Sequence, residues 1–296
     1  MSLNLLTRKM KVKKIYGIGL LGAALFACNP ATQPAPDYIN AQWAKDKLWD
    51  DGQAEVATYD TERIVYGKPR QFDYVYVLVK EEFNQEFRVK TDDYNRSDLY
   101  PVMKVNKFCR IETLKYPYHY LTSVFYKRES PHQVHKLTNT SQEWCGNTAK
   151  SFLENGNQYD FQYMSYWDGQ GNGTTTIEKS PWFEDQLSYT LRTLVFEEGL
   201  QFEVDLYPMQ VSSKASIPVS EKATIAIEKA SVNELTEIDS TLIIEPWKVS
   251  VTRTEGPNLT YWINDVYPNI LLKMEATDGR KLSLKSLTRD AYWDHE

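Results

Sequence analysis

The sequence predicts a mainly β protein, built as a large curved antiparallel sheet or open barrel with one packed amphipathic helix. Aromatic residues, which favour strands, are abundant, with 20 Tyr, 11 Phe and 8 Trp. Apolar and polar residues alternate in many short stretches that are separated by turn residues. A single segment instead repeats its apolar residues at helical spacing. We expect ten or more strands, and a twisted sheet of that size curls or closes rather than lying flat.

Residues 1–27 predict a signal peptide that is removed. Five basic residues lie between Arg8 and Lys14, and the 13 residues 15–27 are apolar. A helix that spans a bilayer needs about 20 apolar residues, whereas the apolar part of a signal peptide has about 7–15. The end of this run, through Cys28, resembles the lipobox of bacterial lipoproteins, which is cut before its cysteine. The resemblance implies that Cys28 is lipidated, and several acyl chains on one residue anchor stably.

The residue after Cys28 is Asn29 rather than the aspartate that retains many such lipoproteins in the inner membrane. The resemblance therefore implies a lipid anchor in the outer membrane of a bacterial cell envelope, with the folded part outside the cytoplasm. Residues 28–40 are rich in proline and predict a stiffened tether. Residues 41–296 predict a single β-rich globular domain, since β domains of this length are common.

The charge of the chain argues against a nucleic-acid partner. Residues 1–27 hold five of the 34 basic residues and no acid, so the other 269 residues carry 29 basic against 40 acidic side chains, a formal charge of −11. The partners that the sequence predicts are a membrane, through the lipid anchor, and an apolar or lipid small molecule. No cofactor is predicted.

Before the strands, Asn40 is expected to cap a short helix that ends before Gly52. Each strand is predicted from a run of β-branched and aromatic residues bounded by turn residues. The runs cover residues 54–66, 71–79, 101–109, 116–126, 137–146, 159–167, 201–207, 223–229, 247–254 and 258–263. A hairpin follows, in which residues 270–274 and 282–284 flank the turn Asp278-Gly279.

The amphipathic helix is predicted to begin at Ser180-Pro181 and to end at Gly199. Serine suits the cap and proline the first helical position. The apolar residues at helical spacing are Trp182, Leu187, Leu191, Leu194 and Val195. The paired carboxylates Glu184-Asp185 and Glu197-Glu198 are expected on solvated faces.

Arg192 is notable because it lies within the apolar part of the predicted helix. Its stem can pack while its guanidinium reaches water or one acid. Alternatively, it is an orienting charge in a ligand cavity of the sheet. The sequence leaves both open, and Arg192 is our candidate cavity residue.

Besides Cys28 the chain has two cysteines, Cys109 and Cys145. A pair in an oxidising compartment favours a disulfide, but two free thiols are equally compatible because the sequence does not fix their separation. Cys145 with His119 or His135 would supply a thiol nucleophile and a base. No spacing rule joins these residues, so we predict no catalytic residue.

Metal sites receive little support from the sequence. His132 and His135 are three residues apart, a spacing that a strand would place on opposite faces. The run Asp168 to Gly173, with Glu178 beyond it, departs from the calcium-loop pattern at Gln170 and at the position of the glutamate. A glycine-rich hairpin turn explains it better. We therefore predict no metal site.

Several motifs in the first half carry a family resemblance. Tyr116-Pro117-Tyr118, Leu121-Thr122-Ser123 and the run Thr138 to Gly146 resemble blocks of an uncharacterised bacterial lipoprotein family whose members are often labelled "septum formation inhibitor Maf". The Ser-x-Ser-Pro-Arg-Arg motif of true Maf nucleotide pyrophosphatases has no counterpart, because arginines follow neither Ser130-Pro131 nor Ser180-Pro181. No pyrophosphatase activity is predicted.

The second half is similar in motif order and spacing to a periplasmic family of unknown function, DUF3108. The motifs are Tyr189 to Leu194, Tyr261-Trp262-Ile263 and Leu282 to Ser286. The resemblance implies a curved sheet that encloses a helix, similar to the open barrels of lipoprotein carriers such as LolA.

The sequence as a whole predicts a cell-envelope lipoprotein that is a binding or accessory module for an apolar or lipid ligand. The alternatives are an envelope enzyme that depends on Cys145 and a purely structural envelope protein. A cavity of about 300 Å³ or more would favour the binding module.

Overall fold

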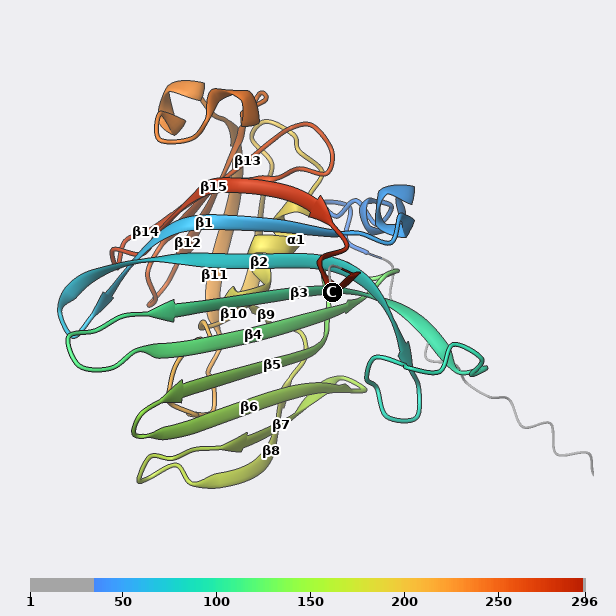
Figure 1. Ribbon diagram of the computed structural model, residues 1–296. Helices are drawn as coiled ribbons and strands as arrows, with labels where there is room; N and C mark the ends of the chain where they lie inside the picture. The colour runs from blue at the N-terminus through green and yellow to red at the C-terminus, as the bar shows by residue number, and fades with distance from the viewer. Residues whose placement is uncertain (1–34, 295–296) are drawn as a thin grey trace, which may run out of the picture. The chain divides into compact units, whose positions relative to one another are not determined.

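The computed structural model describes residues 35–294, and Cys28, the predicted signal peptide and most of the predicted tether lie outside the described residues. The described chain forms one sheet of 15 strands (Figure 1). The strands are β1 (Ala54–Val65), β2 (Lys68–Asn84), β3 (Leu99–Ile111), β4 (Tyr118–Lys127), β5 (Val134–Glu143), β6 (Gly146–Asn155), β7 (Gln158–Met164), β8 (Asn172–Glu178), β9 (Trp182–Phe183), β10 (Gln201–Tyr207), β11 (Glu221–Lys229), β12 (Trp247–Arg253), β13 (Leu259–Ile263), β14 (Leu271–Ala276) and β15 (Lys281–Asp290).

Helical structure in residues 35–294 is short. It consists of one α-helix and several 3-10 turns. These are α1 (Leu187–Thr190), η1 (Trp43–Lys45), η2 (Lys47–Asp50), η3 (Glu184–Gln186), η4 (Leu191–Thr193), η5 (Val232–Leu235), η6 (Ser240–Leu242) and η7 (Tyr292–Asp294). None of the helices in this part of the chain is long and apolar enough to cross a bilayer.

The sheet consists of two meanders that meet at a central seam. Strands β1 to β8 follow one another outward to one edge, and β9 to β15 run from the other edge back to β15, which pairs with β1. Neighbouring strands are antiparallel except for the short parallel pair β9 and β10. The sheet is curved and does not close, since β8 and β9 are its two ends. The mainly β fold class is therefore confirmed, and both halves of the chain share one sheet.

Most strand predictions are confirmed, but three strands were not predicted. One is β6, which lacks the usual alternation of apolar and polar residues because polar side chains occupy part of its inner face. Thr148 and Lys150 are buried there beside Phe152. Another is β8, whose residues are mostly small and polar. The third is the short strand β9, which lies within the segment predicted to be helical. The predicted strand 137–146 also ends early, because Trp144 and Cys145 form the turn between β5 and β6.

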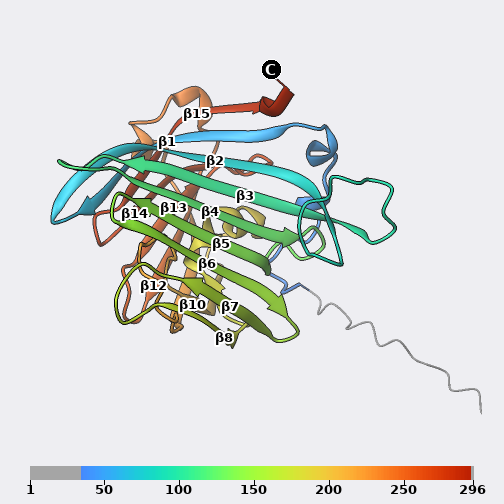
Figure 2. The same ribbon diagram turned by 60° about the horizontal axis from the view of Figure 1, so that its bottom comes forward.

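The long helix predicted from Ser180 to Gly199 is wrong. Its residues form β9, then η3, α1 and η4, and Leu194 is again extended, with ψ 153°. We call residues 182–194 the central segment. It lies between the two halves of the sheet (Figures 1 and 2).

The central segment packs in both directions, which explains the error. Leu187 and Leu191 belong to the apolar core formed with β10 to β15, while Phe183 and Tyr189 belong to the core formed with β2 to β7. A helical apolar pattern assumes one buried face, whereas here nearly every side of a short segment is buried. The predicted helix near Asn40 is likewise replaced by two 3-10 turns, η1 and η2.

Candidate functional site

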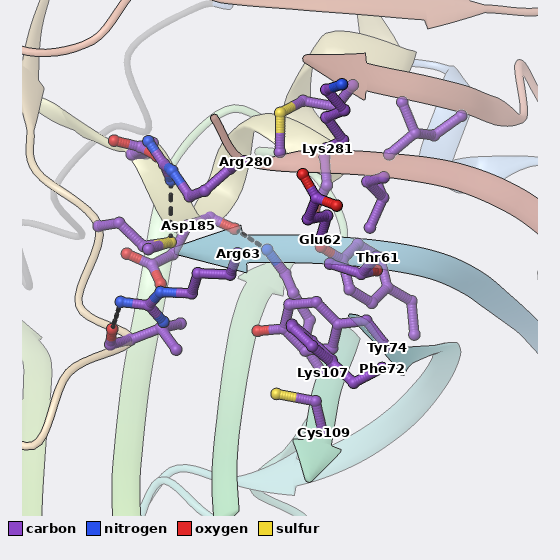
Figure 3. A pocket seen from close by; sticks show the side chains of 18 of the residues that line it. Thr61, Glu62, Arg63, Phe72, Tyr74, Lys107, Cys109, Asp185, Arg280 and Lys281 are labelled. Carbon is purple, nitrogen blue, oxygen red and sulfur yellow. Dashed lines mark hydrogen bonds and ion pairs between the residues drawn. The ribbon is translucent and has the colours of Figure 1, made fainter. Parts of the chain in front are cut away.

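A small cavity lies inside the curved sheet, beside the central segment (Figure 3). Its walls include Tyr74, Lys107 and Cys109 from β2 and β3, Asp185 from η3, and Arg280 before β15. The cavity volume is about 60 Å³. Pockets for drug-sized ligands have about 300–1,000 Å³, whereas one water needs about 10–15 Å³ of such space. The cavity therefore suits a few water molecules and not a lipid chain.

Glu184 carries the strongest charge contacts of this interior. Its carboxylate accepts from Arg253 at 2.5 Å and also from Arg280. Glu184 is 6% exposed, and the two arginines are 8% and 9% exposed. Each arginine has a second acid, Glu221 for Arg253 and Asp278 for Arg280. The prediction of a solvated face for Glu184-Asp185 is therefore wrong, because the segment lies between two sheet halves.

Asp185 is buried with one carboxylate oxygen bonded and the other free. Its Oδ2 accepts from the backbone N–H of Gln210 at 2.7 Å, while its Oδ1 has no hydrogen-bond partner among the described residues. Lys107 donates to the backbone oxygen of Asp185. Burial raises the pKa of Asp185, and the nearby Lys107 opposes that rise. The pair thus places an acid and an amine at the wall of a water-sized cavity, an arrangement that can exchange a proton with enclosed water.

Two buried lysines have lowered pKa values. Burial lowers the pKa of Lys107 from 10.5 to about 8, against the opposing charges of Asp185 and Glu184. Lys150, which donates to the backbone oxygen of Lys214 at 2.9 Å, also has its pKa lowered to about 8 by burial. Both lysines therefore lose their protons more easily in the folded chain than in the unfolded chain.

This difference predicts a pH dependence of stability. Between pH 8 and pH 10.5 the unfolded chain holds more protons on these lysines than the folded chain does, so the free energy of unfolding rises with pH. From about pH 7.5 to about pH 9.5 we expect a rise of about 1–2 kcal/mol from Lys107. Urea denaturation at both pH values measures it. In a Lys107→Met variant the rise shrinks, and an unchanged rise would contradict the assignment.

Arg192, the candidate cavity residue, is not part of the cavity wall. It is 5% exposed, and its guanidinium binds both oxygens of Glu55, at 2.7 and 2.9 Å. It also lies 5.2 Å from the ring centre of Trp43. The structure thus favours the alternative in which the charged head of Arg192 reaches one acid.

The two candidate disulfide cysteines are free thiols in the structure. Cys109 lines the cavity, and burial raises the pKa of its thiol to about 12. Cys145 is exposed in the turn between β5 and β6. Within residues 35–294, no hydrogen bond joins Cys145 to His119 or His135. The nucleophile and base pairing considered from the sequence is therefore not assembled.

The candidate metal ligands are not gathered into one site, and His132 is buried with its Nδ1 atom unpartnered among the described residues. The buried His135 binds Glu154 at 2.7 Å and Tyr100 at 2.8 Å. The run Asp168 to Gly173 leads into β8 and forms the turn of the hairpin of β7 and β8, as predicted. The described residues contain no group of three or more His, Cys, Asp or Glu side chains that could hold a metal ion.

A second hollow lies on the opposite face of the sheet, and we call it the outer groove. Its volume is about 670 Å³. Val75, Phe108 and Leu121 are paired in register across β2, β3 and β4 and form its apolar row. Phe108 and Leu121 are each 42% exposed. Because side chains alternate along a strand, this row points away from the inner face that carries Lys107.

A polar row runs beside the apolar one. Arg110 pairs in register with His119, and His119 pairs with Gln142. All three side chains line the outer groove and are exposed. Arg110 forms an ion pair with Glu112 at 2.7 Å in which both side chains are more than 60% exposed. The outer groove thus offers an apolar floor bounded by an exposed charge pair.

Neither the interior cavity nor the outer groove was predicted from the sequence. Residues that break the alternation of buried and exposed positions along a strand could have indicated both. Lys107 lies between Val105 and Cys109, at an inner-face position of β3 where a charge is unexpected. Phe108 and Leu121 are the converse, since they are large apolar residues at outer-face positions. Only the register of β3 with β4 shows that they are neighbours.

Comparisons with known proteins were made for the whole chain. No protein-family model matches it, and no curated protein matches it. Several solved structures are similar, among them the following two. A β-barrel-like protein of the domain of unknown function DUF1849 from Brucella abortus has 9% identity and a TM-score of 0.48, covering 80% of this chain and 98% of its own. A DUF1089 family protein from Pseudomonas aeruginosa has 10% identity and a TM-score of 0.36, covering 65% and 87%.

These comparisons assign no activity. Neither description states a ligand or a reaction, and identities this low concern the fold alone. Because no family model matches, the resemblances to the Maf-labelled lipoprotein family and to DUF3108 stay predictions.

Proposed function

We propose that this chain is a lipid-anchored protein of the bacterial cell envelope that binds an amphiphilic, lipid-like molecule in its outer groove. The observation that carries the proposal is the apolar row Val75, Phe108 and Leu121 in a groove of about 670 Å³. This volume is within the range of ligand sites, about 300–1,000 Å³. The interior cavity of about 60 Å³ does not support a ligand enclosed by the sheet.

The two rows of the outer groove match the two parts of an amphiphile. Covering Phe108 and Leu121 with an acyl chain removes apolar surface from water, at about 25 cal/mol per Å². Arg110 and His119 lie one row further along the same strands. An anionic headgroup can replace Glu112 at Arg110, because an exposed ion pair contributes only about 0–1 kcal/mol. The proposed ligand is therefore an anionic amphiphile such as a fatty acid or lysophospholipid.

The envelope part of the proposal is supported by the sequence. The basic leader, the short apolar run and the lipobox resemblance at Cys28 favour acylation outside the cytoplasm. The resemblances to a lipoprotein family and to a periplasmic family agree with a location outside the cytoplasm. An anchor at Cys28 would keep the protein at a membrane, where amphiphiles are concentrated.

Mass spectrometry of the full chain extracted from a bacterial envelope tests both parts. We expect a denatured mass that carries acyl chains on Cys28 and a native mass that also carries a bound amphiphile. Cys28→Ala should lose the covalent mass. The double variant Phe108→Ser, Leu121→Ser should keep the covalent mass and bind an added fluorescent fatty acid at least about tenfold more weakly, a loss of about 1.4 kcal/mol.

The matched control is Ser123→Ala, which lies on β4 two residues from Leu121 and outside the groove lining. It should bind the fatty acid as the original chain does. A chain that is always empty and does not bind the fatty acid would refute the binding function. That result would instead favour the structural role, which the nearly filled interior also supports.

A further inference from the structure

Three tyrosine hydroxyl groups converge at one end of the sheet. Tyr66 is in the turn between β1 and β2, Tyr116 precedes β4, and Tyr118 begins β4. The hydroxyl oxygen of Tyr116 lies 3.2 Å from that of Tyr66 and 3.5 Å from that of Tyr118, and the hydroxyls of Tyr66 and Tyr118 are in direct contact. Tyr66 is 50 and 52 residues away from Tyr116 and Tyr118 in the chain, so the register of the sheet brings it to them.

A carboxylate completes the group. Glu143 ends β5 and directly follows Gln142, which pairs in register with His119 of β4, so Glu143 lies beside Tyr118 at this end of the sheet. The Oε2 atom of Glu143 is buried and has no hydrogen-bond partner among the described residues. No lysine or arginine of residues 35–294 forms an ion pair with Glu143. A buried oxygen without a partner is uncommon and needs an explanation, such as a bound water or ion.

We propose that Tyr66, Tyr116, Tyr118 and Glu143 form a binding site for a hard trivalent cation, of which ferric iron is the expected member. An octahedral cation with oxygen ligands about 2.0 Å away needs adjacent ligand oxygens about 2.8 Å apart. The phenol oxygens of Tyr66 and Tyr118 lie 3.2 and 3.5 Å from that of Tyr116, so Tyr116 must move closer by about half an ångström for the three to occupy one face of the octahedron. Tyr66 is 68% exposed, so the remaining positions are open to water or to a small anion.

The binding step balances without any electron transfer. Each phenol that binds the cation releases its proton to solvent, and an oxygen–metal bond replaces the oxygen–hydrogen bond. A small trivalent cation can displace these protons because its charge density is high. Three phenolates and one carboxylate then surround it with oxygen alone. Divalent cations such as Ca²⁺ have a lower charge density and are expected to leave the phenols protonated.

The backbone at Tyr66 supports a role for its side chain. Tyr66 has φ 55° and Gly67 has φ 69°, and the two form a two-residue hairpin turn between Val65 and Lys68. This turn type favours Asn-Gly, whereas a bulky residue with positive φ is strained. Such strain is characteristic of functional sites. An asparagine at position 66 would relieve it but would lose the phenol.

Titration of the purified full chain with ferric citrate tests the proposal. We expect one equivalent of iron to produce the visible phenolate-to-iron charge-transfer absorption. Tyr66→Asn should lose that absorption while unfolding at the same or a higher temperature, so loss of the fold does not explain the result. Tyr118→Phe should weaken iron binding at least about tenfold.

Two controls decide between this site and adventitious binding. Tyr94 is 66% exposed and lies in the loop between β2 and β3, so Tyr94→Phe should keep the absorption. Cys145→Ser should also keep it, since the proposed ligands are oxygens. The proposal is overturned if iron produces no absorption, if Tyr66→Asn retains it, or if Cys145→Ser abolishes it.

Discussion

Replacing Arg192 with methionine is expected to destabilise the folded chain by about 3–5 kcal/mol, because it leaves the buried carboxylate of Glu55 without a counter-charge. The two side chains are each 6% exposed and bind through two hydrogen bonds of 2.7 and 2.9 Å. Whole domains are stable by only about 5–15 kcal/mol. Urea denaturation at neutral pH measures the loss.

The matched control is Lys222→Met. Lys222 also pairs with one acid, Asp205, but the two side chains are 65% and 39% exposed. This change should alter the free energy of unfolding by less than about 1 kcal/mol. Comparing the two variants separates the effect of burial from the effect of losing an ion pair.

The double variant Glu55→Leu, Arg192→Met should recover most of the stability that the single change removes. Replacing a buried pair by apolar side chains of similar volume is often neutral or stabilising by about 1–4 kcal/mol. If the double variant is as unstable as Arg192→Met alone, the loss comes from packing against Trp43 and not from an unpaired charge.

Glu184→Gln is the second change with a large expected effect, again about 3–5 kcal/mol. Glu184 neutralises Arg253 of β12 and Arg280 before β15, and it belongs to the central segment. Glutamine has nearly the same shape, so the expected loss is electrostatic: two buried guanidiniums share less negative charge. The free energy of unfolding from urea titration gives the size of the effect.

Glu228→Gln provides the comparison for this change. Glu228 pairs with Lys248 at 3.1 Å and is 55% exposed, so we expect a change below about 1 kcal/mol. Hydrogen exchange adds a local measurement. Amides of the central segment should exchange faster in Glu184→Gln than in the control, and equal exchange would show that Glu184 does not hold the segment.

The strands could be predicted because their residues follow simple alternation. In β4, for example, Tyr118, Tyr120, Thr122, Val124 and Tyr126 are buried in turn, and the residues between them are more exposed. The hairpin at Asp278-Gly279 was equally clear, since turn residues separate two matched runs. Such features depend on neighbours in the sequence.

The central segment could not be predicted in the same way. Its apolar spacing is that of a helix, but Trp182 and Phe183 pair with β10 and the remainder is packed between two halves of a sheet. No pattern in the sequence near Glu184 indicates that it pairs with Arg253 and Arg280. These contacts depend on the order of strands in the sheet, and tertiary packing overrides local propensity.

The candidate sites show the same limit. Tyr116 and Tyr118 belong to a run that the sequence marks as unusual, but Tyr66 joins them only through the pairing of β1 to β4. In the outer groove, Phe108 and Leu121 are each ordinary exposed residues until the register makes them neighbours. Whether one residue is buried can be predicted from the pattern of its own strand, whereas a site formed by several strands can be predicted only when the order of those strands is known.

The pairing of β1 with β15 has a consequence for how the protein folds. The first strand of the sheet pairs with the last one, through partners such as Tyr59 and Leu284. Until β15 joins the sheet, β1 therefore has one unpaired edge, and contacts this distant in sequence form slowly. A truncation that removes β15 would leave that edge open permanently, and an open edge can pair with another chain.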